Sequence, residues 1–385
     1  MEKNVKAYLT KEDMINENLV FDPLIERHST WLAVNPIQGC PNDCRYCFMK
    51  KNNMTKVKPY VIKEYDKVIQ EITRNKYYTP NIPICYFSKT DIMATKSNID
   101  YLLKFLELLY ESELYNPIVL VTKCFVPVEV INQLKRIQEI GKKVVIYISY
   151  SGLDNTIEKG VNNRYAIENF KNLYDAGINI IHYFRPLIPQ NSTEEIIDNI
   201  VNKVCKYSMA SVVTGLKVYK ELASLYDFWE ELKDVENPDE YECIWPKKIE
   251  EKLKKVALKY DYPIYQTNAC ALEYALGGYD KYGICNTEVC RSFNICDKKM
   301  RETCSAKNRN MTNRQIEEAF RSLGYFAVMY EIVNNILYVK NIVLSNEDIC
   351  SLSGKIHMKV NNTVTNCDTN RYWNNALNGS KQLFV

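Results

Sequence analysis

Short apolar runs alternate with amphipathic stretches between residues 31 and 220, and this pattern constrains the fold of the 385-residue chain more than any other feature. The apolar runs are rich in β-branched residues, and the stretches between them repeat apolar side chains at the spacing of a helix face. Strands and helices that alternate in this way form βα units with a parallel sheet. We therefore predict six strands, at residues 31–36, 84–87, 118–122, 143–150, 179–184 and 211–218.

The chain is long enough for two domains or for one α/β barrel with an appendage. After residue 220 the rhythm changes to helical stretches at 223–233 and 246–260, a cysteine-rich loop, and a helix at 313–323. Two small hairpins should follow, turning at Asn334-Asn335 and at Asn361-Asn362. We expect an N-terminal extension over 1–30, a βα domain over 31–220, a helical and cysteine-rich region over 221–311, and a small α+β module over 312–385.

The chain contains fourteen cysteines, and its first residues lack the apolar segment of an export signal. We therefore expect a cytoplasmic protein whose thiols bind metals or clusters rather than form disulfides. Fifty basic against 47 acidic residues give a net charge of +3, which neither requires nor excludes a nucleic-acid partner. No segment approaches the roughly 20 apolar residues of a membrane span, so we expect no membrane association.

Three cysteines follow the first predicted strand with the spacing C-x3-C-x2-C: Cys40, Cys44 and Cys47. Three thiolates cannot complete a four-ligand zinc site, but they suit three irons of a [4Fe–4S] cluster whose fourth iron stays open to a small chelating ligand. The alternatives are a zinc site that borrows a fourth cysteine and three unrelated buried thiols.

This triplet, at the end of a first strand with βα repeats behind it, resembles the radical S-adenosylmethionine (SAM) superfamily. The segments 146–153 and 182–189 are similar to the spore photoproduct lyase-like branch. The resemblance implies the fold class α/β, with a partial (β/α)6 TIM-type barrel followed by a cysteine-rich and small β-hairpin module. It also implies reductive cleavage of SAM to a 5′-deoxyadenosyl radical that abstracts a hydrogen from a substrate. A reductant protein such as flavodoxin or ferredoxin would supply the electron.

The same resemblance implies that residues at strand ends bind SAM. The matching positions are Ser88, Thr90 and Asp91 after the second strand, Ser149 and Ser151 at the fourth, Arg164 beyond it, and Arg185 at the fifth. The family's Gly-Gly-Glu segment after the second strand is absent here. A salt bridge in the barrel mouth is the alternative role for Arg185.

Cys124 directly follows the third strand. Photoproduct lyase-like enzymes use a cysteine thiol as hydrogen donor to a product radical, so the resemblance makes Cys124 a candidate catalytic residue. A buried structural cysteine is the alternative.

A second group of cysteines falls within 35 residues of the C-terminal region: Cys270, Cys285, Cys290, Cys296 and Cys304. This density suits an auxiliary iron–sulfur cluster, and the region loosely resembles the SPASM or Twitch extension of peptide-modifying radical SAM enzymes. The spacing of these cysteines differs from the cysteine spacing that is typical of that extension. Zinc held by four thiolates and an unliganded set of thiols are the alternatives.

Three functions remain open at this level. The first is a radical SAM enzyme acting on a substrate such as a ribosomal peptide. The second is repair or modification of a nucleic-acid base, which basic and aromatic residues at 291–309 would support. The third is a non-catalytic iron–sulfur electron carrier, which the absence of ferredoxin-type spacing disfavours.

Overall fold

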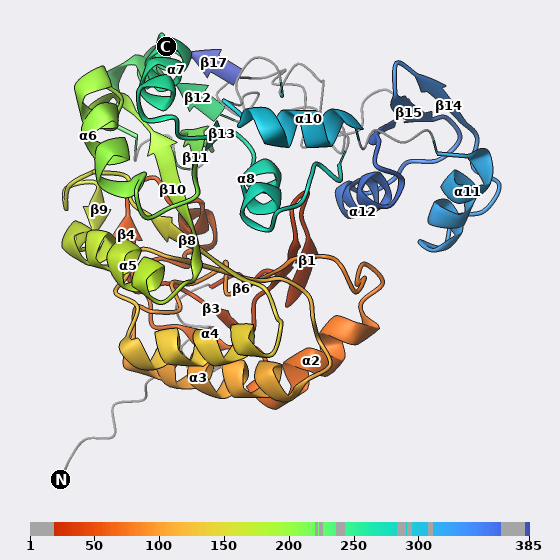
Figure 1. Ribbon diagram of the computed structural model, residues 1–385, viewed down its shortest axis with the longest axis horizontal. Helices are drawn as coiled ribbons and strands as arrows, with labels where there is room; N and C mark the ends of the chain where they lie inside the picture. The colour runs from red at the N-terminus through yellow and green to blue at the C-terminus, as the bar shows by residue number, and fades with distance from the viewer. Residues whose placement is uncertain are drawn as a thin grey trace.

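An eight-stranded sheet is the centre of the computed structural model, which describes residues 19–219, 222, 226–235, 243–282, 290, 295–306, 311–362 and 382–385 (Figure 1). Neighbouring strands run in the order β1 (Ile25–Arg27), β2 (Leu32–Val34), β6 (Ile84–Tyr86), β7 (Ile118–Thr122), β8 (Val144–Ser149), β10 (Asn179–Leu187), β11 (Ala210–Gly215) and β13 (Ile264–Tyr265). All pairings are parallel except that of β1 with β2. The six predicted strands are all present and adjacent, which confirms this part of the prediction.

The apolar composition of these strands explains why they lie at the centre. All six residues of β8 are buried, as expected for a parallel strand covered on both faces. The strands at the two ends of the order, β1 and β13, do not pair with each other, so the barrel is open on one side. The fold is therefore a mixed α/β one with a partial TIM-type barrel.

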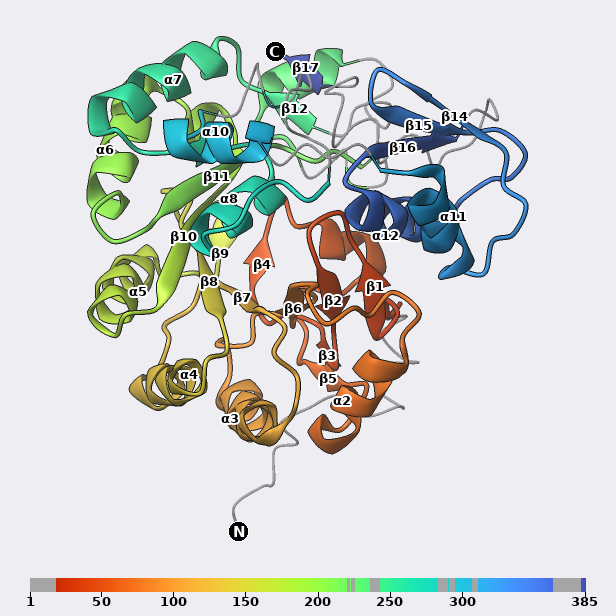
Figure 2. The same cartoon turned by 45° about the vertical axis from the view of Figure 1, so that its right-hand side comes forward.

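Five helices alternate with the strands and lie along the outside of the sheet (Figure 2). They are α2 (Tyr65–Arg74), α3 (Lys96–Glu111), α4 (Val128–Glu139), α5 (Asn163–Asp175) and α6 (Glu194–Val204). Thr95 and Thr193 begin α3 and α6, where their side chains accept hydrogen bonds from free backbone N–H groups of the first turn. These helices match the predicted amphipathic stretches.

The region after the barrel agrees with its prediction at one helix and differs from it elsewhere. Within the described residues, the helix expected over 223–233 is a short 3-10 helix, Glu230–Asp234, because Tyr226 and Trp229 turn inward onto a small core with Leu216. The helix expected at 246–260 is α7 (Ile249–Tyr260). The cysteine-rich stretch contains two helices that we did not predict, α8 (Asn268–Ala275) and α10 (Lys298–Ala306). The chain end returns to this region, since β17 (Gln382–Phe384) pairs with β12 (Cys243–Trp245).

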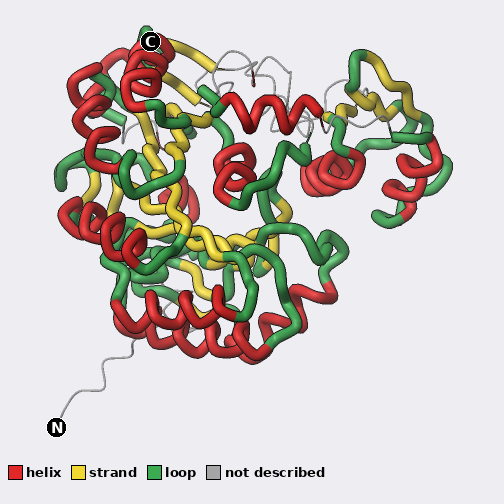
Figure 3. Tube along the Cα trace, viewed as in Figure 1, coloured by secondary structure: helices red, strands yellow, loops and turns green. Residues whose placement is uncertain are grey.

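The last module combines α11 (Asn313–Arg321), β14 (Tyr330–Val333), β15 (Ile336–Val339), α12 (Asn346–Ile356) and β16 (Lys359–Asn362) (Figure 3). The first predicted hairpin is confirmed, and Asn334 and Asn335 both adopt the positive φ that its two-residue turn requires. The second predicted hairpin, at Asn361-Asn362, is wrong in the described part. Ser345 begins helix α12, and β16 after this helix pairs in parallel with β15 instead of turning back at Asn361-Asn362. Residues 363–365 lie outside the described residues.

A buried carboxylate attaches this module to the first edge of the sheet. Asp348 of α12 accepts hydrogen bonds from Lys76 Nζ and the Tyr77 hydroxyl, both at 3.1 Å, and from the Tyr325 hydroxyl at 2.8 Å. The Arg27 guanidinium on β1 also donates to the Cys350 carbonyl at 3.3 Å. No helix among the described residues is both long and apolar enough to span a membrane.

Candidate active site

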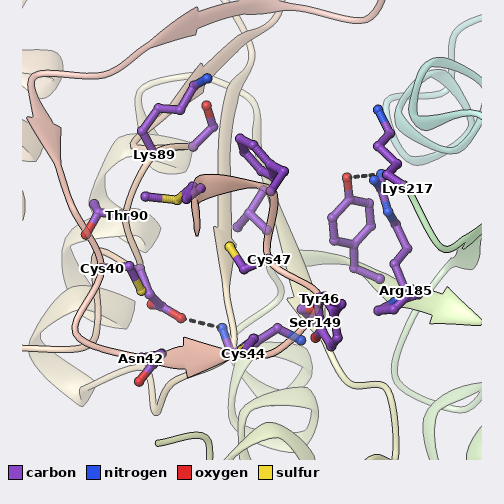
Figure 4. Close-up of a pocket in the computed structure, with 18 of the residues that line it drawn as sticks. Cys40, Asn42, Cys44, Tyr46, Cys47, Lys89, Thr90, Ser149, Arg185 and Lys217 are labelled. Carbon is purple, nitrogen blue, oxygen red and sulfur yellow. Dashed lines mark hydrogen bonds between the residues drawn. The ribbon is translucent and has the colours of Figure 1, made fainter. Parts of the chain in front are cut away.

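Cys40, Cys44 and Cys47 lie in the loop after β2, at the C-terminal edge of the sheet. Two short antiparallel pairs shape this loop: β3 (Ile37–Gln38) with β5 (Tyr60–Val61), and β4 (Asp43–Cys44) with β9 (Glu158–Lys159). Gly39 turns the chain with φ 93°, and a Cβ there would lie only 3.3 Å from the Lys58 carbonyl oxygen. The loop thus brings the three cysteines to one wall of a cavity (Figure 4).

The cavity has a volume of about 550 Å³, which falls in the range of sites for small molecules and cofactors. Residues at the C-terminal ends of successive strands line it, among them Thr122, Ser149, Arg185 and Gly215. Active sites of TIM-type barrels are built at this end of the strands. A Cβ at Gly215 would come within 2.4 Å of the Ile244 carbonyl oxygen, so only glycine lets β11 pass here.

Cys44 is buried, and Cys40 and Cys47 are half-buried. Burial raises the pKa of Cys44 to about 12, and it also raises the pKa of Cys40 and of Cys47. A metal must therefore displace protons from these thiols when it binds. Within the described residues no three His, Cys, Asp or Glu side chains converge closely enough to hold a single metal ion. Three thiolates, one on each of three irons, are the donor set of an iron–sulfur cluster whose fourth iron stays open.

Three predicted SAM ligands line the cavity and also hold the cysteine loop in place. The Thr90 hydroxyl donates to the Gly39 carbonyl at 2.6 Å, and the Ser88 hydroxyl donates to Asn35 Oδ1 at 3.0 Å. Asp91 accepts from the Thr122 hydroxyl at 2.6 Å and from the Lys123 backbone N–H at 2.8 Å. These bonds tie the end of β6 to the cysteine loop and to the end of β7.

Two further predicted ligands present polar atoms to the cavity. Ser149 is buried at the end of β8, and its hydroxyl makes no hydrogen bond to any residue that the structure describes. The Arg185 guanidinium lies 4.6 Å from the centre of the Tyr183 ring and donates to the Tyr183 hydroxyl. Arg185 forms no ion pair within the described part of the chain, so the expected alternative of a salt bridge has no support there. Figure 4 shows Arg185 and Lys217 across the cavity from Cys40 and Thr90.

The structure places two predicted SAM ligands away from the cavity. Arg164 lies in the first turn of α5 on the surface, with 82% of its side chain exposed and its Nε 3.0 Å from Glu168. Ser151 is buried, and its hydroxyl accepts from the Leu153 N–H at 3.2 Å. Neither lines the cavity, so we withdraw both from the predicted SAM site.

Cys124 lies next to the cysteine loop but does not line the cavity. Its thiol accepts weakly from Asn42 Nδ2 at 3.8 Å. Burial raises the pKa of Cys124, and the nearby Asp91 carboxylate raises it further. This placement beside Asp91 does not support a hydrogen donor that reaches the substrate, and the donor role stays a prediction.

A buried charge network that no sequence motif predicts lies beside the cysteines. Glu158 is 1% exposed and pairs with Cys44 across β4 and β9. Its Oε1 accepts from Lys123 Nζ at 2.7 Å and from the Tyr46 hydroxyl. Burial, the largest single influence, lowers the pKa of Lys123, but the negative groups around it, Glu158 first and then Cys44 and Asp91, together raise that pKa above its ordinary value. A Glu-Lys-Gly sequence after the fourth strand carries no signal that would have assigned Glu158 to the site.

Comparison with known families decides what this site is. Residues 34–201, which contain all three cysteines and strands β6 to β10, match the radical SAM superfamily. This part of the chain is a radical SAM domain. The domain makes the protein an enzyme, and its family binds a [4Fe–4S] cluster and SAM. No curated protein matches the chain.

Solved structures of radical SAM enzymes are similar at low sequence identity. A spore photoproduct lyase variant is 14% identical, with a TM-score of 0.48, over 63% of this chain and 77% of that chain. Spore photoproduct lyase complexed with dinucleoside spore photoproduct is 15% identical, with a TM-score of 0.46, over 63% and 76%. SuiB of Streptococcus suis, bound to S-adenosylmethionine, is 16% identical, with a TM-score of 0.37, over 57% and 50%.

Proposed function

We propose that this radical SAM enzyme abstracts a hydrogen atom from a peptide that is made on the ribosome. When bound, the cluster and SAM supply the 5′-deoxyadenosyl radical that removes the hydrogen. One observation carries the proposal: the three cysteines of the matched domain form one wall of a cavity that also receives the Ser149 hydroxyl and the Arg185 guanidinium. The hydroxyl can hold a polar group of SAM, and the guanidinium can hold a carboxylate or phosphate.

The cavity lining combines aromatic side chains with polar and charged ones. Aromatic side chains make up much of the lining: Trp31, Tyr46, Phe48, Phe87, Tyr183 and Tyr219. Apolar surface beside a reactive intermediate limits its contact with water. Thr90 ties the cysteine loop to the end of β6, and Asp91 ties that end to β7, so these bonds help to fix the position of the loop.

The C-terminal module favours a peptide over a nucleic acid. Between Met311 and Asn362 there are five basic and five acidic residues, whereas surfaces that bind nucleic acid are strongly basic. Its edge strand β14 exposes Ile332 and Val333, with Phe326 and Met329 exposed just before it. An extended peptide can add to such an edge through backbone hydrogen bonds. The basic stretch 291–309, which would support the nucleic-acid alternative, lies partly outside the described residues.

The proposal also covers the electron donor of the enzyme and its location in the cell. Radical SAM enzymes need an electron donor, and we propose a small reductant protein such as flavodoxin or ferredoxin. We also propose a cytoplasmic location, because free cysteines in this number persist in a reducing compartment.

A binding selection tests the choice of substrate. Reconstituted protein is presented with a random peptide library, and Ile332→Lys should reduce peptide capture about tenfold because a charge then occupies the proposed edge. Val343→Lys, at an exposed apolar position outside β14, is the matched control. Binding of single-stranded DNA or transfer RNA that weakens steeply between about 50 and 200 mM salt would instead support the nucleic-acid alternative.

A further inference from the structure

A thin two-stranded ribbon separates Cys44 from the surface of the protein. In the antiparallel pair of β4 and β9, Cys44 lies opposite Glu158, and Asp43 lies opposite Lys159. Successive side chains of a strand point to opposite faces. Cys44 and Glu158 are buried, and Cys44 lines the cavity (Figure 4), whereas Lys159 is exposed. The ribbon therefore has one face toward the cavity and one toward solvent.

The solvent face of this ribbon is basic. Asp43 forms an ion pair with Lys50, so its negative charge is balanced. The Lys56 backbone N–H donates to the Asn42 carbonyl at 3.1 Å, which brings Lys56 beside the ribbon. The exposed basic residues here, which we call the lysine face, are Lys56, Lys58 and Lys159.

The sequence of the cysteine loop has the same imbalance of charge. Residues 39–63 contain one acidic residue, Asp43, and six basic ones: Arg45, Lys50, Lys51, Lys56, Lys58 and Lys63. Over the whole chain, 50 basic residues nearly balance 47 acidic ones. Of the two acids in residues 150–160, Glu158 is buried against Lys123, which leaves Asp154 as the exposed one. Positive charge is therefore concentrated over the cysteine loop.

A basic surface this close to a proposed cluster ligand suits the entry of electrons. Asp43 and Cys44 are neighbours in the chain, so their Cα atoms are about 3.8 Å apart. Electron transfer slows steeply with distance, and only the ribbon would separate a carrier bound here from the cluster. We propose that the lysine face is the docking site of an acidic electron-carrier protein. The inference rests on the proposed function, which requires such a donor: one electron passes from the carrier to the cluster, and no bond forms or breaks in that step.

The lysine face fits a protein carrier better than a nucleic acid. Surfaces for single-stranded nucleic acid combine cations with aromatic rings that stack on the bases. The two aromatic residues beside the cysteines, Tyr46 and Phe48, line the cavity instead. Complexes of electron carriers have small interfaces, and a few cations around one contact point are enough to steer an oppositely charged partner to it. The carrier should therefore present carboxylates.

An auxiliary cluster in the C-terminal region would be a second point of entry for electrons. This cluster stays a prediction, and Cys285 lies outside the described residues. Cys270 and Cys304 are buried. The lysine face, in contrast, lies beside the cysteines of the matched radical SAM domain. The docking site therefore does not depend on an auxiliary cluster.

Cleavage of SAM driven by a protein carrier tests the docking site. The double variant Lys56→Glu, Lys159→Gln lowers the charge of the lysine face by three, and glutamine at 159 avoids a like-charge pair with Asp43. With flavodoxin and its NADPH-dependent reductase, 5′-deoxyadenosine should form about tenfold more slowly than in the wild type. With dithionite, a small reductant that needs no docking site, the rate should stay within about twofold. Lys254→Glu, Lys135→Gln makes the same change of charge on exposed residues of α7 and α4 and is the matched control.

Calorimetry with flavodoxin measures docking without turnover. Flavodoxin should bind the reconstituted wild type more weakly as salt rises from about 50 to 200 mM, and the double variant should lose about tenfold in affinity. Equal flavodoxin-driven rates in the double variant and the wild type, or an equal loss in the control, would overturn the docking site. So would transfer RNA binding that the double variant loses while it keeps flavodoxin. If dithionite gave no product with the wild type, the proposed reaction would fail, and calorimetry would still decide the docking site.

Discussion

Glu158 lies directly opposite Cys44 in the antiparallel pairing of β4 with β9. Its carboxylate meets Lys123 from the end of β7 and the hydroxyl of Tyr46, which stands between Cys44 and Cys47. One buried carboxylate thus joins the cysteine loop, the third βα unit and the segment after the fourth strand. We infer that this network fixes the position of Cys44.

Glu158→Gln should destabilise the protein and loosen the cysteine loop. The substitution leaves the buried Lys123 cation without a counter-charge, and breaking such a pair costs about 3 kcal/mol. Urea unfolding measures the loss, and iron analysis should show weaker retention of the cluster that Cys40, Cys44 and Cys47 would hold. Glu168→Gln is the control, because its exposed pair with Arg164 contributes less than about 1 kcal/mol. Equal losses in the two variants would contradict the assigned role.

Arg185→Gln should weaken the binding of an anionic group in the cavity. Loss of a charge-assisted hydrogen bond costs about 1.5–3 kcal/mol, or roughly ten- to hundredfold in affinity. Calorimetry with SAM and the reconstituted protein locates the effect: weaker SAM binding assigns Arg185 to the SAM carboxylate. Normal SAM binding with impaired peptide turnover assigns it to the substrate. Arg164→Gln, on the exposed face of α5, should change neither, and an equal effect there would argue against the cavity as the site.

Cys124→Ala tests the hydrogen-donor prediction against the observed placement. The thiol lies beside Asp91 and outside the cavity lining, so we expect a stability loss of about 1–2 kcal/mol and SAM cleavage within twofold of the wild type. Products formed from a captured peptide in deuterated water should then be the same for variant and wild type. Dimerised or differently labelled products from the variant alone would restore Cys124 as the donor.

His182 should make stability depend on pH. The side chain is fully buried between the Ser211 hydroxyl and the Tyr150 carbonyl, each at 2.8 Å, and burial lowers its pKa to about 4. Between pH 6.5 and 4 the unfolded chain binds a proton that the folded one does not, so stability is full above pH 6.5 and falls as the pH drops. The fall amounts to about 3 kcal/mol at most.

Urea unfolding at pH 7.5, 6 and 5 measures this slope for the wild type and for His182→Gln. The variant should be less stable at pH 7.5 but should lose less with falling pH. His28→Gln, at a half-exposed histidine, should keep the wild-type slope. A slope in His182→Gln equal to that of the wild type would exclude His182 as its source.

The strands could be predicted because each carries its own local signal. A run such as Val144–Ser149 is apolar up to its last residue, and the family resemblance, rather than this pattern, assigned Ser149 to the site. The cysteine triplet is likewise local, with all three ligands within eight residues. Patterns of this kind can be recognised in the sequence without any knowledge of the tertiary structure.

The missed features depend on contacts between distant segments. β9 has only two residues, Glu158 and Lys159, so no periodicity marks it, and its pairing with Cys44 appears only in the folded chain. Arg164 has the right order along the sequence, but the start of α5 at Asn163 turns its side chain to the surface. The Asn361-Asn362 pair reads locally as a turn, yet the pairing of β16 with β15 extends it into a strand.

Formation of 5′-deoxyadenosine tests the central claim most directly. Protein reconstituted with iron and sulfide in the absence of oxygen is mixed with dithionite and SAM, and the nucleoside is quantified by chromatography. We predict turnover by the wild type and no product from Cys40→Ala, Cys44→Ala or Cys47→Ala, while Cys205→Ala retains wild-type activity. Undiminished 5′-deoxyadenosine from any one of the three triplet variants would contradict the assignment of these cysteines to the cluster that cleaves SAM.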